Sequence, residues 1–438
     1  MRIPLLGVEA QELIETLAKF KSNDVDWKRA RSWSLVYYGG ELHTEFLKQV
    51  YAMYFSENGA GPTLFPSLKR MEAEVVAMVT ELVNGGKDSC GTMTSGGTES
   101  ILLAMKAYRD QARDIQPHIT APELLVPESA HPAFLKAAAY FDLKVIPVPL
   151  NDRFEVEIDA LCEHISDQTI CIVASAPSFP HGVLDPIAEM GEVASTHGIG
   201  LHVDACLGGL LLPFIRKIGR EIPRFGFDVS GVTSISTDLH KNGYAAKGAS
   251  AILYSNKELR RYQFFISTNW PGGMQASPTM LGTRPGGAIA AAWAALMVLG
   301  ERGYIDIARR TMDVADRLVK ELNKIPGVRV LGAPVMSVFG FTIQDVNVFA
   351  VGDRIDALGW RINRQNYPPA LHVVVTPNHE PVVSEFITDL TEAIAAERRD
   401  PTFQSGKEAI LYGGTAQTMV NADIGDIMIS KIEDNYTL

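Results

Sequence analysis

The stretch Ser236-Thr237-Asp238-Leu239-His240-Lys241 decides the fold class, together with the earlier stretch His202-Val203-Asp204-Ala205. In each stretch a side chain that can carry charge comes after an apolar, strand-like run. In an open sheet of parallel strands, ligands bind at the carboxyl ends of the strands. We therefore expect Asp204 and Lys241 to lie at that edge of a sheet and to contact the same ligand.

Strands and helices alternate along the middle of the chain, which predicts an α/β fold with a mostly parallel, doubly wound sheet flanked by helices. The expected strands are residues 124–127, 144–150, 169–174, 200–203 and 250–254, and the expected helices are residues 41–53, 66–82, 132–140, 186–197 and 286–322, the last broken near 300–303. After residue 327 the pattern predicts a smaller α+β domain, with helical character returning near residue 424. We expect an N-terminal segment of residues 1–60, a large domain of 61–325 and a small domain of 326–438.

The pairing of a lysine with a carboxylate suits one cofactor, pyridoxal 5'-phosphate (PLP). A lysine amine forms a Schiff base with an aldehyde, and a carboxylate keeps a pyridine nitrogen protonated by charge pairing. The sequence thus predicts a PLP enzyme acting on an amine or amino acid, with Lys241 as the Schiff-base residue and Asp204 as the partner of the ring nitrogen.

Two further features fit the same cofactor. The run Thr94-Ser95-Gly96-Gly97-Thr98-Glu99-Ser100 precedes a helix, and its glycines let the backbone approach a phosphate at the helix N-terminus. His131 opens another helix and can stack on a flat ring. Taken singly, the run also reads as an ordinary N-cap and His131 as a surface histidine. The order of loop, histidine, carboxylate and His-Lys favours the cofactor.

Spacing leaves the reaction open among three outcomes at Cα of the substrate, namely loss of a carboxylate, loss of a proton and retro-aldol cleavage of the Cα–Cβ bond. In each of them the released Lys241 amine can act as an acid or base at Cα.

Composition excludes several function classes. The chain has 438 residues, 46% hydrophobic and 21% charged, and a formal net charge of −11, so we expect no nucleic-acid partner. The four cysteines form no C-x-x-C pair, which favours reduced thiols in a cytoplasmic protein and no metal site. The N-terminus lacks a signal-peptide pattern, and the longest apolar run, residues 288–300, is shorter than the roughly 20 residues of a membrane span.

The chain resembles the sphingosine-1-phosphate lyases among the PLP-dependent, decarboxylase-like enzymes. The resemblance covers most of the chain and is most specific in the run from residue 231 to 250. Other shared motifs are Asn84-Gly85-Gly86, Phe179-Pro180-His181-Gly182-Val183-Leu184-Asp185-Pro186, Arg284-Pro285-Gly286-Gly287 and Tyr367-Pro368-Pro369. The resemblance implies the aspartate aminotransferase-like fold, with a seven-stranded type of sheet, and a homodimer whose active sites lie at the subunit interface.

The resemblance also implies a role for each site residue. Lys241 and Asp204 would have the roles given above, His131 would stack on the ring, and Ala205 would pack near its other face. The cofactor phosphate would be held by Gly97, Thr98 and His240, with Thr283 approaching from the second subunit. Tyr37 and Lys247 would line the substrate site, Lys247 receiving a substrate phosphate, and Asn58 would be a further site position. The implied reaction is retro-aldol cleavage of a phosphorylated long-chain amino alcohol to a fatty aldehyde and phosphoethanolamine.

Two positions on the substrate side depart from the family. Where the lyases have Asn-Pro-Leu-His-Pro, this chain has Asn58-Gly59-Ala60-Gly61-Pro62, so Gly61 replaces a histidine. Where they have Gly-Gly-x-Tyr-Ala-Ser-Pro, Gln275 replaces the tyrosine. We also expect no counterpart of the family's membrane anchor. These departures keep a second interpretation open, an amino-acid decarboxylase or an aldolase that acts on a different amine.

Overall fold

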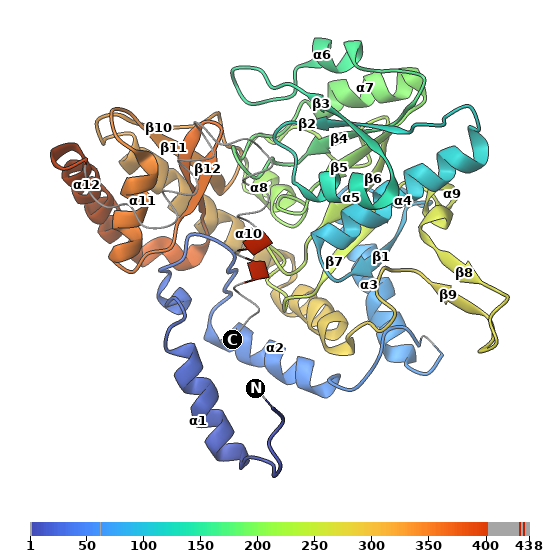
Figure 1. Cartoon of the computed structure of the whole chain (residues 1–438), viewed down its shortest axis with the longest axis horizontal. Coiled ribbons are helices and arrows are strands. Elements are labelled where there is room, and N and C mark those ends of the chain that lie inside the picture. Colours follow the sequence, from blue (N-terminus) through green and yellow to red (C-terminus); the bar gives the residue numbers. More distant parts are fainter. Residues whose placement is uncertain (1, 62, 402–428, 431, 434–438) are drawn as a thin grey trace. The chain divides into compact units, whose positions relative to one another are not determined.

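A seven-stranded sheet forms the centre of the larger of two compact units (Figure 1). The computed structural model describes residues 2–61, 63–401, 429–430 and 432–433. The strand order is β1-β7-β6-β5-β4-β2-β3. The strands are β1 (Cys90–Thr94), β2 (Glu123–Pro127), β3 (Lys144–Val148), β4 (Thr169–Ser175), β5 (Gly200–Asp204), β6 (Val232–Thr237) and β7 (Ser250–Tyr254).

The sheet is parallel except at one strand. Strands β6, β5, β4, β2 and β3 run parallel to one another, whereas β7 pairs antiparallel with both β6 and β1. The predicted mostly parallel sheet is therefore confirmed. Because β7 runs the other way, its first residue, Ser250, lies between the carboxyl ends of β1 and β6, where Thr94 pairs with Ser250 and Thr237 with Ala251.

Helices cover the sheet and bury its apolar residues. Helices α4 (Gly97–Ile115) and α5 (Ala133–Phe141) pack on one another and on the sheet, burying Leu103, Phe134 and Leu124 in one core (Figure 1). The other helices of this unit are α2 (Glu41–Met53), α3 (Pro66–Leu82), α6 (Ile158–Glu163), α7 (Ile187–His197), α8 (Leu212–Lys217), α9 (Lys257–Arg260) and most of α10 (Gly286–Leu322). A short hairpin of β8 (Phe265–Ser267) and β9 (Gln275–Ser277) follows α9.

Helix α10 is interrupted where the sequence predicted, because Gly300 is non-helical with φ 56°. Among the described residues it is the single helix long and apolar enough to cross a membrane by length and composition, and half of its most apolar window is buried in the structure.

The smaller unit has its own sheet, in the order β10-β11-β13-β12, with helices α11 (Val348–Ala357) and α12 (Val383–Arg399). Its strands are β10 (Val328–Val330), β11 (Val338–Ile343), β12 (Asn363–Asn366) and β13 (Pro369–Val374). The N-terminal residues complete its core, since the Trp33 ring lies 4.6 Å from that of Phe386 and 6.2 Å from that of Trp360. Helix α1 (Ala10–Lys21) also belongs to this unit.

The residue ranges of the two compact units differ from those of the expected domains. One unit contains Met1–Val36, Arg317–Val330 and Gly340–Leu438, and the other contains Tyr37–Asp316 and Leu331–Phe339. The expected boundaries followed residues 60 and 325. Every expected site residue lies in the second, larger unit. The helix expected near residue 424 lies outside the described residues.

Candidate active site

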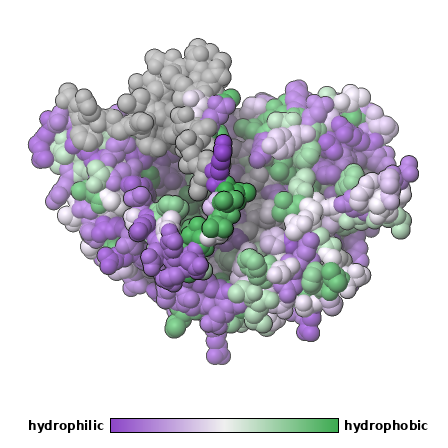
Figure 2. All heavy atoms as spheres, turned by 60° about the horizontal axis from the view of Figure 1, so that its bottom comes forward, coloured by the Kyte–Doolittle hydropathy of each residue, from purple (hydrophilic) through white to green (hydrophobic). Residues whose placement is uncertain are grey.

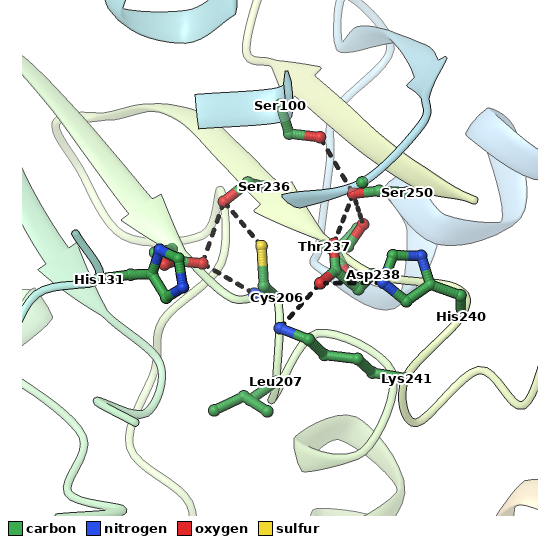
Figure 3. Close-up of polar contacts among 12 residues, drawn as sticks. Ser100, His131, Cys206, Leu207, Ser236, Thr237, Asp238, His240, Lys241 and Ser250 are labelled. Carbon is green, nitrogen blue, oxygen red and sulfur yellow. Dashed lines mark hydrogen bonds and ion pairs between the residues drawn. The ribbon is translucent and has the colours of Figure 1, made fainter. Parts of the chain in front are cut away.

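Lys241 lies in the loop that leads from β6 back to β7 (Figure 3). The loop is closed by the backbone, because the His240 N–H donates to the Ala249 carbonyl at 3.0 Å and the Tyr244 N–H donates to the Lys241 carbonyl at 3.0 Å. The Lys241 side chain is 28% exposed, and its Nζ lies 2.9 Å from Oδ2 of Asp238. The amine is therefore accessible and also paired with an anion.

Asp238 is buried and surrounded by donors. Its Oδ1 accepts the Ser250 hydroxyl at 2.6 Å, and its Oδ2 lies 3.8 Å from His240 Nε2 as well as close to Lys241. Burial alone would raise the pKa of Asp238, but the Lys241 and His240 charges outweigh it and hold the pKa below its ordinary value. Burial alone would lower the pKa of Lys241, but Asp238 and other neighbours hold it above its ordinary value. The pair is thus ionised.

The glycine-containing run connects β1 to the N-terminus of α4, where Gly96, Gly97 and Thr98 are half-exposed. The buried Glu99 carboxylate fixes this turn, because it accepts the N–H and the hydroxyl of Ser95 at 2.6 and 2.7 Å. Gly97 packs so closely that an added Cβ would lie 2.7 Å from Cys206 Sγ. The first turn of α4 thus presents backbone N–H groups beside a residue without a side chain, as an anion site requires.

Asp204 is half-exposed at the end of β5 and is held by a chain of buried hydrogen bonds. Its Oδ1 accepts the Cys206 N–H at 3.0 Å and the Ser236 hydroxyl at 3.2 Å. Behind them, His202 Nε2 lies 3.4 Å from Ser236 Oγ, and its Nδ1 lies 2.7 Å from Ser234 Oγ. Burial lowers the pKa of His202 to about 4, although Asp204 opposes this shift. His202 is therefore neutral, and its donor and acceptor both serve the chain that orients Asp204.

His131 and Ala205 are two further residues for which the sequence predicts cofactor contacts. His131 is exposed, and its Nδ1 accepts the Ala133 N–H at 3.1 Å, which fixes the ring at the start of α5. Figure 3 draws it in the same close-up as Lys241 and Asp238. Ala205 is fully buried directly after Asp204, and its N–H donates to the Ser236 carbonyl at 2.9 Å.

Tyr37 and Lys247 extend the site beyond Lys241. Lys247 Nζ lies 5.3 Å from the Tyr37 ring centre and 3.4 Å from the His240 carbonyl oxygen. Desolvation and the nearby Lys241 charge lower the pKa of Lys247, against the opposing Asp238. Burial raises the pKa of Tyr37 to about 12, while Lys241 opposes this shift and Asp238 adds to it. Near neutral pH the phenol is therefore protonated and can donate a hydrogen bond.

Two expected site residues lie together but apart from this cluster. Asn58 Nδ2 lies 3.5 Å from Thr283 Oγ1, and Asn58 Oδ1 accepts the Arg284 N–H at 3.0 Å. Within residues 2–61 and 63–401, neither residue has a hydrogen bond to Lys241, Asp204 or His240. Of the two positions that depart from the family, Gln275 is exposed on β9 and Gly61 lies in the turn after Asn58.

The residues present fit PLP. The N-terminus of α4 can hold a phosphate, the accessible Lys241 amine can hold an aldehyde carbon, and the half-exposed Asp204 carboxylate can hold a protonated ring nitrogen. The phosphate contacts would come from Gly97, Thr98 and His240.

Sequence reasoning missed the residues that support this site from below. Asp238 was within the decisive stretch but had no assigned role, and His202, Cys206, Ser236 and Ser250 were not singled out. One signal was available for Asp238, because an acidic residue three positions before a lysine in a turn can pair with it. The other four are small or neutral side chains whose burial in neighbouring strands has no local sequence pattern.

Comparisons with known proteins agree with this geometry. Residues 46–344 match the family described as the pyridoxal-dependent decarboxylase conserved domain. Sphingosine-1-phosphate lyase 1 of Rattus norvegicus is 42% identical over 99% of this chain and 76% of its own length, and the lyase of Arabidopsis thaliana is 41% identical over 99% and 81%. The solved sphingosine-1-phosphate lyase of Burkholderia pseudomallei superposes with a TM-score of 0.88 at 37% identity, covering 92% of this chain and 94% of that one. This chain therefore belongs to the pyridoxal-dependent decarboxylase family and, within it, to the sphingosine-1-phosphate lyases.

Proposed function

We propose that this protein is a PLP-dependent carbon–carbon lyase that cleaves a phosphorylated long-chain amino alcohol to a fatty aldehyde and phosphoethanolamine. The observation that carries the proposal is the Lys241 amine paired with Asp238, whose carboxylate packs on Gly97 at the N-terminus of α4, in a chain 36–42% identical to sphingosine-1-phosphate lyases from several eukaryotes. A phosphorylated long-chain amino alcohol has an amino group that could replace the Lys241 amine on the cofactor, and it has a hydroxyl on the neighbouring carbon.

When bound, PLP supplies an electron sink that weakens the bonds at Cα of the substrate. Lys241 would hold the cofactor through its amine, and the same amine, when it is free, could return a proton to Cα of the substrate. Asp204 keeps the ring nitrogen protonated, and the buried chain through Ser236 and His202 keeps its carboxylate oriented. His131 would cover one face of the ring.

Tyr37 and Lys247 act on the substrate. Retro-aldol cleavage requires a base to take the proton of the hydroxyl on Cβ as the Cα–Cβ bond breaks, and the free Lys241 amine could take this proton and return it to Cα. The protonated Tyr37 phenol hydrogen-bonds to that hydroxyl and orients it. Lys247 lies over the Tyr37 ring and is close enough for the Lys241 charge to affect its pKa. It is a second cation at the site and attracts the substrate phosphate.

The experiment traps the cofactor and identifies the product. Borohydride reduction of the PLP-loaded protein, followed by peptide mass mapping, should place the adduct on Lys241, and a Lys247→Ala variant should keep it there. Incubation of a separate, unreduced sample of the PLP-loaded protein with a sphingoid-base phosphate should release one aldehyde per amine phosphate. An adduct at another lysine, or no aldehyde over many turnovers with the cofactor bound, contradicts the proposal.

A second candidate reaction is decarboxylation of an amino acid, and Gly61 and Gln275 favour it. Glycine supplies no donor for a substrate phosphate, and glutamine cannot replace a phenol as an acid. Carbon dioxide release from a panel of amino acids, with no aldehyde from sphingoid phosphates, would establish this reaction in place of the lyase.

The functional unit that we propose is a homodimer in the cytoplasm. Helix α2 and the β8–β9 hairpin leave large apolar side chains open to solvent, with Leu42 91% and Met274 85% exposed. Figure 2 turns the bottom of Figure 1 forward and shows hydrophobic residues exposed among hydrophilic ones on that face. A second copy would cover such residues and bring Thr283 to the partner's phosphate site. Light scattering of the purified protein should give twice the chain mass, and a monomer that is fully active would contradict the shared site. The four cysteines are free, which supports a reducing compartment.

A further inference from the structure

The proposed reaction gives no role to the buried carboxylate of Asp238, although this carboxylate forms an ion pair with the reactive Lys241 amine. Asp238 is 1% exposed and contacts Lys241 Nζ at 2.9 Å and Ser250 Oγ at 2.6 Å. Removing a carboxylate from water is costly unless a cation and further donors replace the lost hydration. Lys241 is the nearest such cation, so the pairing stabilises both side chains.

The support of Asp238 is built into the sheet. Ser250 is the first residue of β7, and its hydroxyl also lies 3.0 Å from Ser100 Oγ on α4, while Ser100 Oγ lies 2.7 Å from Thr94 Oγ1 at the end of β1 (Figure 3). The same carboxylate packs on Gly97, because a Cβ there would lie 3.0 Å from both of its oxygens. Asp238 is thus held in place between the phosphate-binding turn and the lysine.

Other ionisable groups also face Lys241. Tyr37 and Cys206 approach from other segments, and His240 and Lys247 lie in its own loop. Of these groups Lys247 is a cation, and the pKa values of the Tyr37 phenol and the Cys206 thiol are raised, so both are uncharged near neutral pH. Burial lowers the pKa of His240, although Asp238 opposes this shift, so the imidazole adds little charge. Asp238 is therefore the dominant anion at the Lys241 nitrogen.

We propose that Asp238 is a positioning residue for Lys241, which holds the lysine side chain at the cofactor site and keeps its nitrogen cationic both before and after the cofactor is attached. This inference rests on the attachment at Lys241 proposed above. It predicts two opposite effects. Attachment condenses the neutral amine with the aldehyde and releases water, so Asp238 slows this step by favouring the ammonium form. After attachment, Asp238 favours the protonated nitrogen, which is the form that an incoming substrate amine attacks most readily.

The test is Asp238→Asn, which keeps the size and the hydrogen-bonding oxygen but removes the charge. In the cofactor-free protein, the pH profile of reductive methylation at Lys241, followed by peptide mass mapping, should shift down by about 1 to 3 pH units. In the PLP-loaded protein, the pH titration of the visible absorbance band should shift in the same direction by a similar amount. Ser250→Ala is the matched control, because it removes a hydrogen bond to Asp238 and keeps the charge; both profiles should move by less than about 0.5 pH unit.

The outcomes distinguish the proposed role of Asp238 from the proposed attachment of the cofactor at Lys241. Unchanged profiles for Asp238→Asn, in a variant whose circular dichroism and cofactor content match the wild type, overturn the role of Asp238. Absence of a borohydride adduct on wild-type Lys241 overturns the attachment site instead, while the methylation profile of the cofactor-free protein still reports on the pair. Should Asp238→Asn not fold, the wild-type protein decides: half-maximal methylation of Lys241 at a higher pH than that of Lys247 supports the proposal, and the reverse order contradicts it.

Discussion

Substitution of Gly97 by alanine tests the packing of the phosphate-binding turn. The added methyl group would lie 2.7 Å from Cys206 Sγ and 3.0 Å from both Asp238 oxygens, and real Cβ atoms essentially never come closer than 3.0 Å to other heavy atoms. Cys206 is buried, and Asp238 is held by Lys241 and Ser250, so neither can move freely. We expect the first turn of α4 to shift away from them.

Overpacking of this kind costs about 1 to 3 kcal/mol. If that cost appears in cofactor binding, PLP should bind about 5-fold to about 140-fold more weakly, since about 1.4 kcal/mol corresponds to tenfold. The assay is a titration of the cofactor-free protein with PLP, followed by the visible absorbance. Gly86→Ala is the matched control, because its methyl group would meet nothing within 4 Å.

A second substitution separates this explanation from a general defect of the turn. Cys206→Ala removes the sulfur atom that the new methyl group meets, so the double variant Gly97→Ala/Cys206→Ala should recover part of the lost affinity. The coupling energy in this double-mutant cycle should be about 0.5 to 3 kcal/mol in favour of the double variant. Unchanged PLP affinity in Gly97→Ala, or strictly additive effects in the cycle, would refute the reasoning.

Three more predictions concern buried residues of the larger unit, namely His202, Asp185 and Gly182. His202→Phe removes one hydrogen-bond partner from each of the buried Ser234 and Ser236 hydroxyls, and urea unfolding should show a loss of about 1 to 3 kcal/mol; a neutral result would mean that these two hydrogen bonds contribute nothing to stability. Burial raises the pKa of Asp185 to about 7, so the native state holds a proton that the unfolded state has lost between about pH 4 and pH 7, and stability falls as the pH rises through this window. In the wild type the free energy of unfolding should fall by about 4 kcal/mol between these pH values, and Asp185→Asn should abolish this fall. An unaltered pH dependence of unfolding in the variant would contradict the raised pKa of Asp185. Gly182→Ala should lower the melting temperature far more than Gly198→Ala: both glycines have a positive φ, of 66° and 65°, but a Cβ at 182 would lie 1.8 Å from the Val338 carbonyl oxygen and one at 198 in open space. Equal melting temperatures would show that this contact is relieved.

Much of the fold could be predicted because local patterns carry it. Helices α2 and α3 have the predicted bounds, residues 41–53 and 66–82, and strand β7 has its predicted bounds, 250–254. Apolar residues at helical spacing and a proline at the first position of α3 make these elements recognisable. Strand β3 ends at Val148, two residues before its predicted end at residue 150, because Pro149 follows Val148 and cannot donate a strand hydrogen bond.

The remainder depends on contacts between distant segments. The antiparallel direction of β7 has no local signal, because a buried strand has the same composition in either direction. The role of Asp238 depends on its burial against Ser250 and Gly97, which are far from it in sequence. Lys241, Asp204 and Gly97 are expected to contact the cofactor because their residue types match its chemistry in chain order, and these contacts remain predictions. Asn58 and Thr283 lie beside each other as a pair, and their cofactor roles remain a prediction about a second chain.

The turnaround between β6 and β7 has a practical meaning for enzyme engineering. Its two ends are anchored on adjacent strands, with Thr237 opposite Ala251, and the His240 N–H closes it against Ala249. Adding or deleting even one amino acid there would change which face of the strand each following side chain occupies. Libraries that aim at new substrates should therefore vary residue identity within this segment at constant length.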